Sequence, residues 1–343
     1  MAAISFSHPV TRVDEERGHF FGHEHGFGHH HSTHVISRPF AGRIGGNQQF
    51  SINHLHPDKS AILRRTPDAA PYLSWSDSFR LAPLLHIELW KQALYEGWAM
   101  CMFTFLSGLT TLAVAPLGGA TSLGGFVPTL IGVTETIISL ALFIYVAGPV
   151  SGGHVNPLIT IGTFCARLAT FPRTILYVSF QLLGATIGGF LVRAAVDNGP
   201  LPATALAGCY LDPQLTTPAT AYAIEALSAL SVVYLAFGVG LDPRQRLVVS
   251  PSLAPILVGF AVGLVLFCSA FVKKGYLGAC VNPARCFGLM AASGNWKYHY
   301  IHWAGDLTGA AINGFFCWLM PPGSNARVDD MTLSPAVHAE ESK

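Results

Sequence analysis

Two Asn-Pro pairs are the parts of this sequence whose residue types and spacing could do chemistry. Asn156-Pro157 and Asn282-Pro283 each follow a segment that contains glycine and precede a short apolar run. Asparagine is a favoured helix N-cap and proline a favoured first helical residue, so each pair predicts the start of a short helix. The N-terminus of a helix exposes N–H donors and carries about half a positive charge. Each pair could therefore hold the oxygen atom of a polar molecule and repel a cation.

Arg285 lies just after the second pair, within Ala284-Arg285-Cys286. It is the only basic residue deep in an apolar stretch near either pair. A charge at membrane depth is expensive and is by default functional. Arg285 is therefore a candidate functional residue.

The segments that must position these groups are long and apolar. The 343 residues are 51% hydrophobic and 11% charged, whereas soluble domains usually carry about 25% charged residues. A membrane-spanning helix needs about 20 apolar residues, and six segments offer this length: 90–114, 126–148, 174–195, 219–240, 253–272 and 298–320. The apolar runs after Asn156 and Asn282 are too short to span, so we expect two re-entrant half-helices in an all-α membrane protein. The net charge of +1 argues against a nucleic-acid partner.

The apolar segments repeat in two halves. Glu96 in the first segment and Glu225 in the fourth precede Asn156 and Asn282 by similar intervals. Three spans per half is an odd number, so the halves must be inverted relative to each other, which places a site near the membrane midplane. A glycine pair in the third segment and another in the sixth predict close helix packing. These glycines are Gly184, Gly188, Gly305 and Gly309.

Two Asn-Pro boxes in matching halves of an apolar chain resemble the signature of the major intrinsic proteins, the family of aquaporins and aquaglyceroporins. Cys286 after Arg285, and Leu158 where the first box usually has alanine, are similar to the X intrinsic protein subfamily. The resemblance covers roughly residues 89–321. It implies an inverted repeat of six transmembrane helices and two half-helices, one pore per chain, and a homotetramer. The boxes are Asn156, Pro157 and Leu158 in the first half, and Asn282, Pro283 and Ala284 in the second.

The resemblance also implies a selectivity filter of four residues. Counted from the boxes, these positions fall on Thr136, Leu266, Ala279 and Arg285. The water-selective pattern of the family has an aromatic residue at the first position and histidine at the second, and both are missing here. We therefore expect a wider and less polar bore that admits glycerol-sized uncharged solutes beside water. Leu158 needs extra space, because the alanine of the first box normally abuts the proline of the other box.

Four further polar residues near the boxes allow more than one interpretation. By resemblance, Glu96 and Glu225 are structural acceptors for the backbone of the re-entrant loops, although a proton relay is an alternative. His154 precedes the first box and is either a pH sensor or a hydrogen-bonded loop residue. Asp306 lies four residues after His302, so the two could pair on one helix face. We assign no function to Asp306.

The seven cysteines are scattered without metal-ligand spacing, so no metal or cofactor is expected. Cys209 resembles a cysteine in an outer-loop motif of the X intrinsic proteins. A disulfide that involves Cys209 is one interpretation, because an outward face permits oxidation. Two free thiols, at Cys209 and Cys286, are the other interpretation.

The two ends of the chain fall outside the resemblance. Residues 1–85 are polar, Gly-rich and His-rich, and this composition predicts a disordered tail before a channel domain at 86–320. The histidines of residues 22–34 could bind a metal or sense pH, or could simply belong to a solvated tail. Residues 79–90 predict an amphipathic lead-in at the membrane interface, and residues 321–343 a second tail.

Arginines in the loops predict the orientation. Arg167 and Arg173 lie between the second and third spans, and Arg244 and Arg246 between the fourth and fifth. Basic loops favour the cytoplasm, so both tails are expected there, with the plasma membrane as the site. The function predicted is a passive channel for water and small uncharged solutes such as glycerol that excludes ions and protons. We do not expect the protein to be an enzyme, because no pairing of a nucleophile with a general base is found near the boxes. The alternative is an inverted-repeat secondary transporter with Glu96 and Glu225 as coupling carboxylates.

Overall fold

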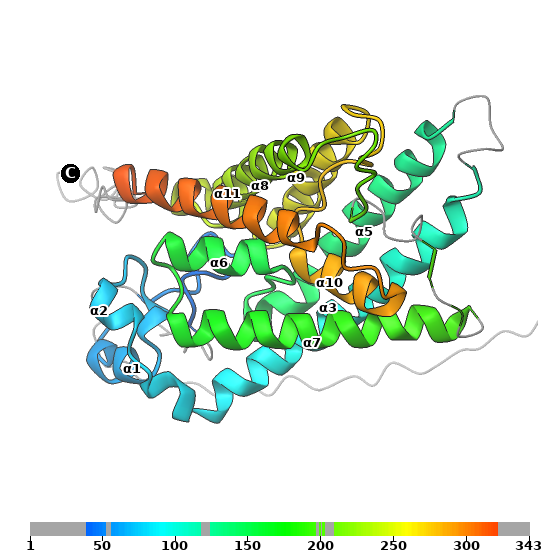
Figure 1. The fold of residues 1–343 in the computed structure, drawn as a ribbon. Coiled ribbons are helices and arrows are strands. Elements are labelled where there is room, and N and C mark those ends of the chain that lie inside the picture. The colour runs from blue at the N-terminus through cyan, green and yellow to red at the C-terminus, as the bar shows by residue number, and fades with distance from the viewer. Residues whose placement is uncertain are drawn as a thin grey trace, which may run out of the picture. The chain divides into compact units, whose positions relative to one another are not determined.

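The same order of helices occurs twice in the chain: two long helices, a short one and a further long one (Figure 1). The computed structural model describes residues 39–52, 56–117, 124–196, 199, 201–202 and 209–321. The first half contains α3 (Ile87–Val114), α5 (Phe126–Ser151), α6 (Pro157–Cys165) and α7 (Phe171–Ala195). The second contains α8 (Pro218–Gly240), α9 (Leu253–Ser269), α10 (Pro283–Ser293) and α11 (His299–Leu319). This is the expected all-α repeat, with α6 and α10 as the two half-helices.

The long helices differ in how clearly each can span a membrane. By length and composition, α3, α5, α7 and α8 are long and apolar enough. The helix α9 has 17 residues and ends at Ser269, before the expected end of its segment at residue 272. The helix α11 has 21 residues but carries the polar residues His299, His302 and Asp306. The six long helices still correspond one to one with the six expected spans.

Helices α7 and α8 begin at matching caps in the two halves. The Thr170 side chain accepts a hydrogen bond from the backbone N–H of Arg173 at the start of α7. Thr217 accepts one from Thr220 at the start of α8. A proline occupies one of the first two positions of both helices, where its missing N–H removes no helical hydrogen bond.

Within each half, the first and last long helices lie side by side, α3 against α7 and α8 against α11. The glycine pairs make this possible. A Cβ atom on Gly184 would collide with the carbonyl oxygen of Gly97, and one on Gly309 would lie 2.6 Å from the amide nitrogen of Leu230. The expected role of these glycines in close helix packing is confirmed.

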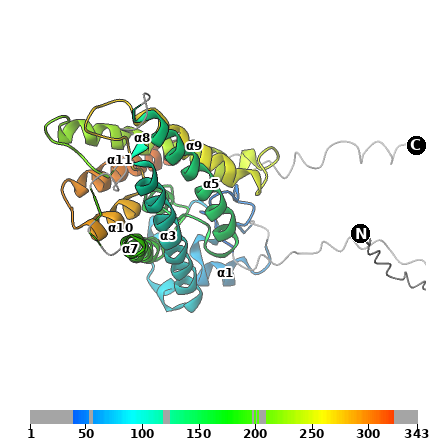
Figure 2. The same ribbon diagram turned by 90° about the vertical axis from the view of Figure 1, so that its right-hand side faces the viewer.

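The half-helices cross between the halves. Helix α10 of the second half packs on α7 of the first, and α6 packs on α11 (Figure 1). Helices α5 and α9 also contact each other across the halves, as the view in Figure 2 shows. Each half therefore completes the surroundings of the other half's Asn-Pro box.

The region expected as a disordered tail is folded over residues 39–52 and 56–85, which we call the N-terminal segment. It contains the short helices α1 (Lys59–Arg65), η1 (Pro67–Ala69), α2 (Trp75–Ser78) and η2 (Ala82–Leu85). Phe40, Ala41 and Ile44 are buried in it. Composition misled the prediction, because a few apolar residues and one buried ion pair fix this segment. The His-rich residues 22–34 and the tail from 322 onward lie outside the described residues.

The ion pair joins Asp68 of the N-terminal segment to Arg173 of α7. The carboxylate accepts Arg173 Nε–H at 2.7 Å and Nη2–H at 3.0 Å, and both side chains are buried. Thr170 donates to the same carboxylate through its backbone and its hydroxyl. Burial raises the pKa of Asp68, but the charge of Arg173 and these hydrogen bonds outweigh burial and hold that pKa below its ordinary value.

Both basic loops flank the N-terminal segment. The backbone N–H of Leu73 donates to the carbonyl of Arg167, between α6 and α7. The Gln49 amide donates to the carbonyl of Arg246, between α8 and α9. The two loops therefore lie at one end of the helix bundle, as the count of spans requires.

Candidate functional site

The two Asn-Pro boxes meet through reciprocal hydrogen bonds. Asn156 Nδ2 donates to the carbonyl of Val281 at 2.7 Å, and Asn282 Nδ2 donates to the carbonyl of Val155 at 3.1 Å. Each asparagine also caps its own half-helix, because its Oδ1 accepts a backbone N–H from the first turn. An amide nitrogen carries two hydrogens. Asn156 therefore retains a second N–H that could meet a passing oxygen, whereas Asn282 Nδ2 also lies 3.9 Å from the Sδ of Met100, a weak acceptor.

One buried glutamate holds each re-entrant loop. Glu96 accepts the backbone N–H groups of His154 and Val155 at 3.0 and 2.7 Å, the hydroxyl of Ser151 and the amide of Gln181. Glu225 accepts the backbone N–H of Cys280 at 3.0 Å and that of Val281 at 3.4 Å, the hydroxyl of Tyr276, and lies 2.5 Å from His302 Nδ1. Both carboxylates are 0% exposed, so these partners replace water.

Asp306 does not pair with His302 as the helical spacing suggested. The imidazole of His302 turns to Glu225 instead. Asp306 is 2% exposed, and neither of its carboxylate oxygens accepts a hydrogen bond from the described residues.

The four expected filter positions line one cavity of about 310 Å³. Thr136 of α5 donates its hydroxyl to the carbonyl of Gly132, which leaves an acceptor lone pair for the cavity. The side chains of Leu266 of α9 and Ala279 form an apolar part of the cavity wall. Arg285, at the start of α10, also lines the cavity, and its Nη2 lies 3.3 Å from the Sγ of Cys280. We call this space the Arg285 cavity.

Sequence reasoning missed Glu135, which also lines the Arg285 cavity. Its Oε2 lies 3.5 Å from the Thr136 hydroxyl, and its buried Oε1 has no hydrogen-bond partner among the described residues. A lone acidic residue in the apolar stretch 126–148 was the available signal, since such a charge is by default functional in a membrane span. The cavity therefore offers an acceptor on α5 as well as the donors of Arg285.

His154 lies at the opposite end, under the N-terminal segment. Its Nδ1 is 3.1 Å from the Thr160 hydroxyl, and its Nε2 is 2.9 Å from the carbonyl of Gly42, which can only accept. The ring of Phe40 lies 5.5 Å from the imidazole, centroid to centroid. His154 is thus a hydrogen-bonded loop residue whose approach is covered by residues 40–44. We call this region the His154 mouth.

Leu158 is fully buried and belongs to the same apolar cluster as Ile44 of the His154 mouth and Ala284 of the second box. The extra volume of leucine is therefore accommodated in the core between the boxes. Both asparagine caps remain intact beside it.

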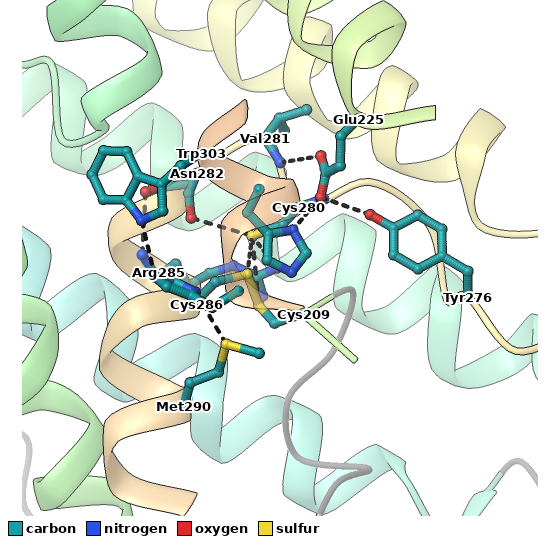
Figure 3. The surroundings of a disulfide bond; sticks show 12 residues. Cys209, Glu225, Tyr276, Cys280, Val281, Asn282, Arg285, Cys286, Met290 and Trp303 are labelled. Carbon is teal, nitrogen blue, oxygen red and sulfur yellow. Dashed lines mark hydrogen bonds and ion pairs between the residues drawn. A yellow bond between two sulfur atoms is a disulfide. The ribbon is translucent and has the colours of Figure 1, made fainter. Parts of the chain in front are cut away.

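Cys209 and Cys286 form a disulfide, which decides between the two interpretations that the sequence left open (Figure 3). Cys280 lies against this bond, so that three cysteine sulfur atoms fall within 4.8 Å of one another. Spacing along the chain predicted no such cluster, because 71 residues separate Cys209 from Cys280. Only the fold brings the segment before α8 onto α10.

Comparison with known proteins agrees with this geometry. The family model described as major intrinsic protein matches residues 84–317. The chain is 30% identical to "Probable aquaporin TIP1-2" of Oryza sativa subsp. japonica over 67% of this chain and 86% of that protein. It is 30% identical to "Aquaporin TIP1-1" of Arabidopsis thaliana over 65% of this chain and 84% of that protein. The X-ray structure of the aquaglyceroporin from Plasmodium falciparum shares the fold, with a TM-score of 0.50 and 18% identity over 66% of this chain and 94% of that one. The chain is therefore a member of the major intrinsic protein family, whose channels span membranes.

Proposed function

We propose that this channel conducts water and small uncharged solutes of about the size of glycerol, and that it excludes ions and protons. The observation that carries the proposal is the Arg285 cavity. Thr136, Leu266, Ala279 and Arg285 face one space in which neither an aromatic ring nor an imidazole narrows the first two positions. A cavity lined by both apolar and hydrogen-bonding groups suits a polyol, whose carbon backbone and hydroxyls need different partners.

Exclusion of cations is supported by the positive charges along the path, which act against the Glu135 carboxyl group that lines the same cavity. Arg285 is one fixed positive charge, and the N-termini of α6 and α10 add partial positive charges at Asn156 and Asn282. An ion would also lose its hydration in a bore of this kind, whereas a neutral solute exchanges one set of hydrogen bonds for another.

A secondary transporter finds no support in the carboxylates. Glu96 and Glu225 each accept several hydrogen bonds from the loop that they hold. A coupling carboxylate must instead bind and release its ion during transport. We therefore expect solute flux that does not change when an ion gradient is imposed.

The test is flux through purified channel in proteoliposomes, with water, glycerol and urea compared by light scattering. The double variant Thr136→Phe with Leu266→His should lower glycerol flux far more than water flux, because it narrows the cavity and adds an imidazole. Thr134→Phe is a matched control, since Thr134 lies on the same helix but is exposed away from the cavity. Equal loss of glycerol and water flux in the double variant would contradict the filter assignment.

The assembly and orientation are part of the proposal. We infer a homotetramer of the X intrinsic protein type, with large apolar side chains of α3, α5 and α8 exposed to neighbours or lipid. The basic loops support a cytoplasmic His154 mouth. The disulfide at the other end supports an oxidising compartment there, such as the exterior of the plasma membrane. To test this orientation, single cysteines are engineered into each loop of the channel and labelled with a membrane-impermeant thiol reagent in intact cells.

A further inference from the structure

A third cysteine lies against the disulfide of Cys209 and Cys286. The Sγ of Cys280 is 2.8 Å from the Sγ of Cys286 and 3.6 Å from the Sγ of Cys209 (Figure 3). All three residues are at most 2% exposed, so they are shielded from dissolved thiols and disulfides. The proposed permeation path uses none of these sulfur atoms.

We propose that Cys209, Cys280 and Cys286 form a disulfide-exchange site in which Cys280 is the exchanging thiol. The Cys280 thiol loses its proton and its sulfur attacks the Sγ of Cys286. A bond forms between Cys280 and Cys286 while the bond between Cys209 and Cys286 breaks. The Cys209 sulfur leaves with the electron pair and takes up the proton. The number of disulfides and thiols is unchanged, so no oxidant or reductant is required.

The arrangement of the site favours internal exchange over exchange with the surroundings. Thiol–disulfide exchange depends on access of the attacking sulfur to the bond, and Cys280 is already in contact with it. Cys268, by contrast, is a free cysteine that is exposed on α9. Uncatalysed disulfide rearrangement takes minutes to hours, which sets the timescale for the exchange.

The exchange site is joined to the pore through Arg285. The Nη2 of Arg285 donates to the Sγ of Cys280 at 3.3 Å, and the Cys280 Sγ also lies 3.2 Å from the carbonyl oxygen of Asn282. A sulfur atom that enters a disulfide loses its proton and moves toward its new partner. Both contacts then change, at the residue that lines the Arg285 cavity and at the second Asn-Pro box. This consequence rests on the proposed function, whereas the exchange itself does not.

Linkage mapping tests the exchange directly. Purified channel is incubated for hours at neutral pH, quenched in acid, blocked with N-ethylmaleimide, digested without reduction and analysed by mass spectrometry. Wild type should yield the Cys209–Cys286 linkage together with linkages that contain Cys280. Cys280→Ser should yield only Cys209–Cys286, and Cys268→Ser should match wild type.

Two further variants force the alternative bonds. Cys209→Ser, oxidised mildly after purification, should form Cys280–Cys286, and Cys286→Ser should form Cys209–Cys280, with loss of maleimide labelling at Cys280 when each oxidised variant is unfolded without reductant. Complete labelling of Cys280 in both assembled variants overturns the proposal. If either variant fails to assemble, the wild-type sample decides, and the absence of every Cys280 linkage after a day overturns the proposal equally.

Flux supplies the second readout. Cys209→Ser oxidised to the Cys280–Cys286 form should differ in its ratio of glycerol to water flux from the same variant kept reduced, because Cys280 contacts Arg285. An equal ratio in the two forms would overturn the link to Arg285. Exchange seen by mapping in a channel that conducts no glycerol would instead contradict the proposed function and leave the exchange site standing.

Discussion

The loop before α6 and the loop before α10 share one backbone plan. Val155 and Val281 have positive φ angles of 46° and 47°, and each presents its carbonyl to the asparagine of the other loop. A buried glutamate accepts backbone N–H groups in both loops. Non-glycine residues seldom adopt this conformation, so the same strained geometry at both places indicates that the glutamate and the opposite asparagine hold it there.

The loops differ in what covers them. Residues 40–44 and the ion pair of Asp68 with Arg173 cover the first loop, at the His154 mouth. The disulfide and the side chains of Tyr276 and His302 support the second, next to the open Arg285 cavity. The inverted repeat thus determines how the two asparagines meet. The parts that do not repeat determine which side chains cover or support each loop. Variants can therefore separate the contacts that both loops share, made by the glutamates and asparagines, from the contacts that support only one loop.

The largest loss of stability should follow from removing a glutamate that holds the backbone of one of the two loops. Glu96→Ala and Glu225→Ala each leave at least three buried donors without an acceptor. An unpaired buried donor costs about 1–3 kcal/mol, so both variants should fail to yield a stable channel. Thermal unfolding and size-exclusion profiles in detergent measure this. A stable Glu225→Ala beside an unstable Glu96→Ala would mean that the disulfide replaces the glutamate in the second loop.

The next largest effect should be on the docking of the N-terminal segment, which covers only the first loop. Asp68→Ala leaves the buried guanidinium of Arg173 without its carboxylate, which costs about 3–5 kcal/mol in comparable sites. The N-terminal segment should undock and become sensitive to trypsin at Arg43, which is half-buried in the docked segment, whereas Arg64 and Arg65 are already exposed. A deletion of residues 1–38 keeps every described contact and is the control. Undocking in the control would place the anchor before residue 39.

The same ion pair has a defined pH dependence. The pKa of Asp68 is lower in the docked state than in an unfolded chain, so ionised Asp68 stabilises docking above its ordinary pKa of about 3.9. That stabilisation is lost only as the pH falls through the lowered value. Trypsin resistance should therefore hold between pH 5 and 8, about the range in which proteins are most stable. Undocking within that range would exclude Asp68 as the titrating group.

The sequence predicted the repeated parts well and the unrepeated parts poorly. Asn156 and Asn282 could be placed because a cap, a proline and an apolar run are local signals. The folding of residues 39–52 and 56–85 could not be predicted, because Asp68 meets Arg173 across 105 residues of chain. The link from Cys209 to Cys286 spans 77 residues and remained undecided for the same reason.

A smaller effect is expected from the charge in the Arg285 cavity. Arg285→Val removes one fixed charge and its donors, while the half-helix termini at Asn156 and Asn282 remain. A detectable but modest leak of protons or small cations should follow, with neutral-solute flux retained or raised. Voltage-clamp conductance beside the swelling rate measures both. Loss of neutral flux in an assembled Arg285→Val channel would make Arg285 a structural residue.

The smallest effect, and the one that separates the two mouths, should come from Phe40→Ala. The Phe40 ring covers His154, and the guanidinium of Arg173 lies 4.0 Å above its centre. Truncation removes this cover, whereas Asp68 and Ile44 still hold the N-terminal segment. Water and glycerol flux should rise together by a similar factor, because the residues that line the Arg285 cavity are untouched. The swelling rates of paired proteoliposome samples measure this ratio, and Phe50→Ala is the matched control, since that ring packs on Arg43 and makes no ring contact with His154. A changed ratio of glycerol to water flux in Phe40→Ala would show that the His154 mouth also selects solutes, and the division of tasks between the two mouths would then be wrong.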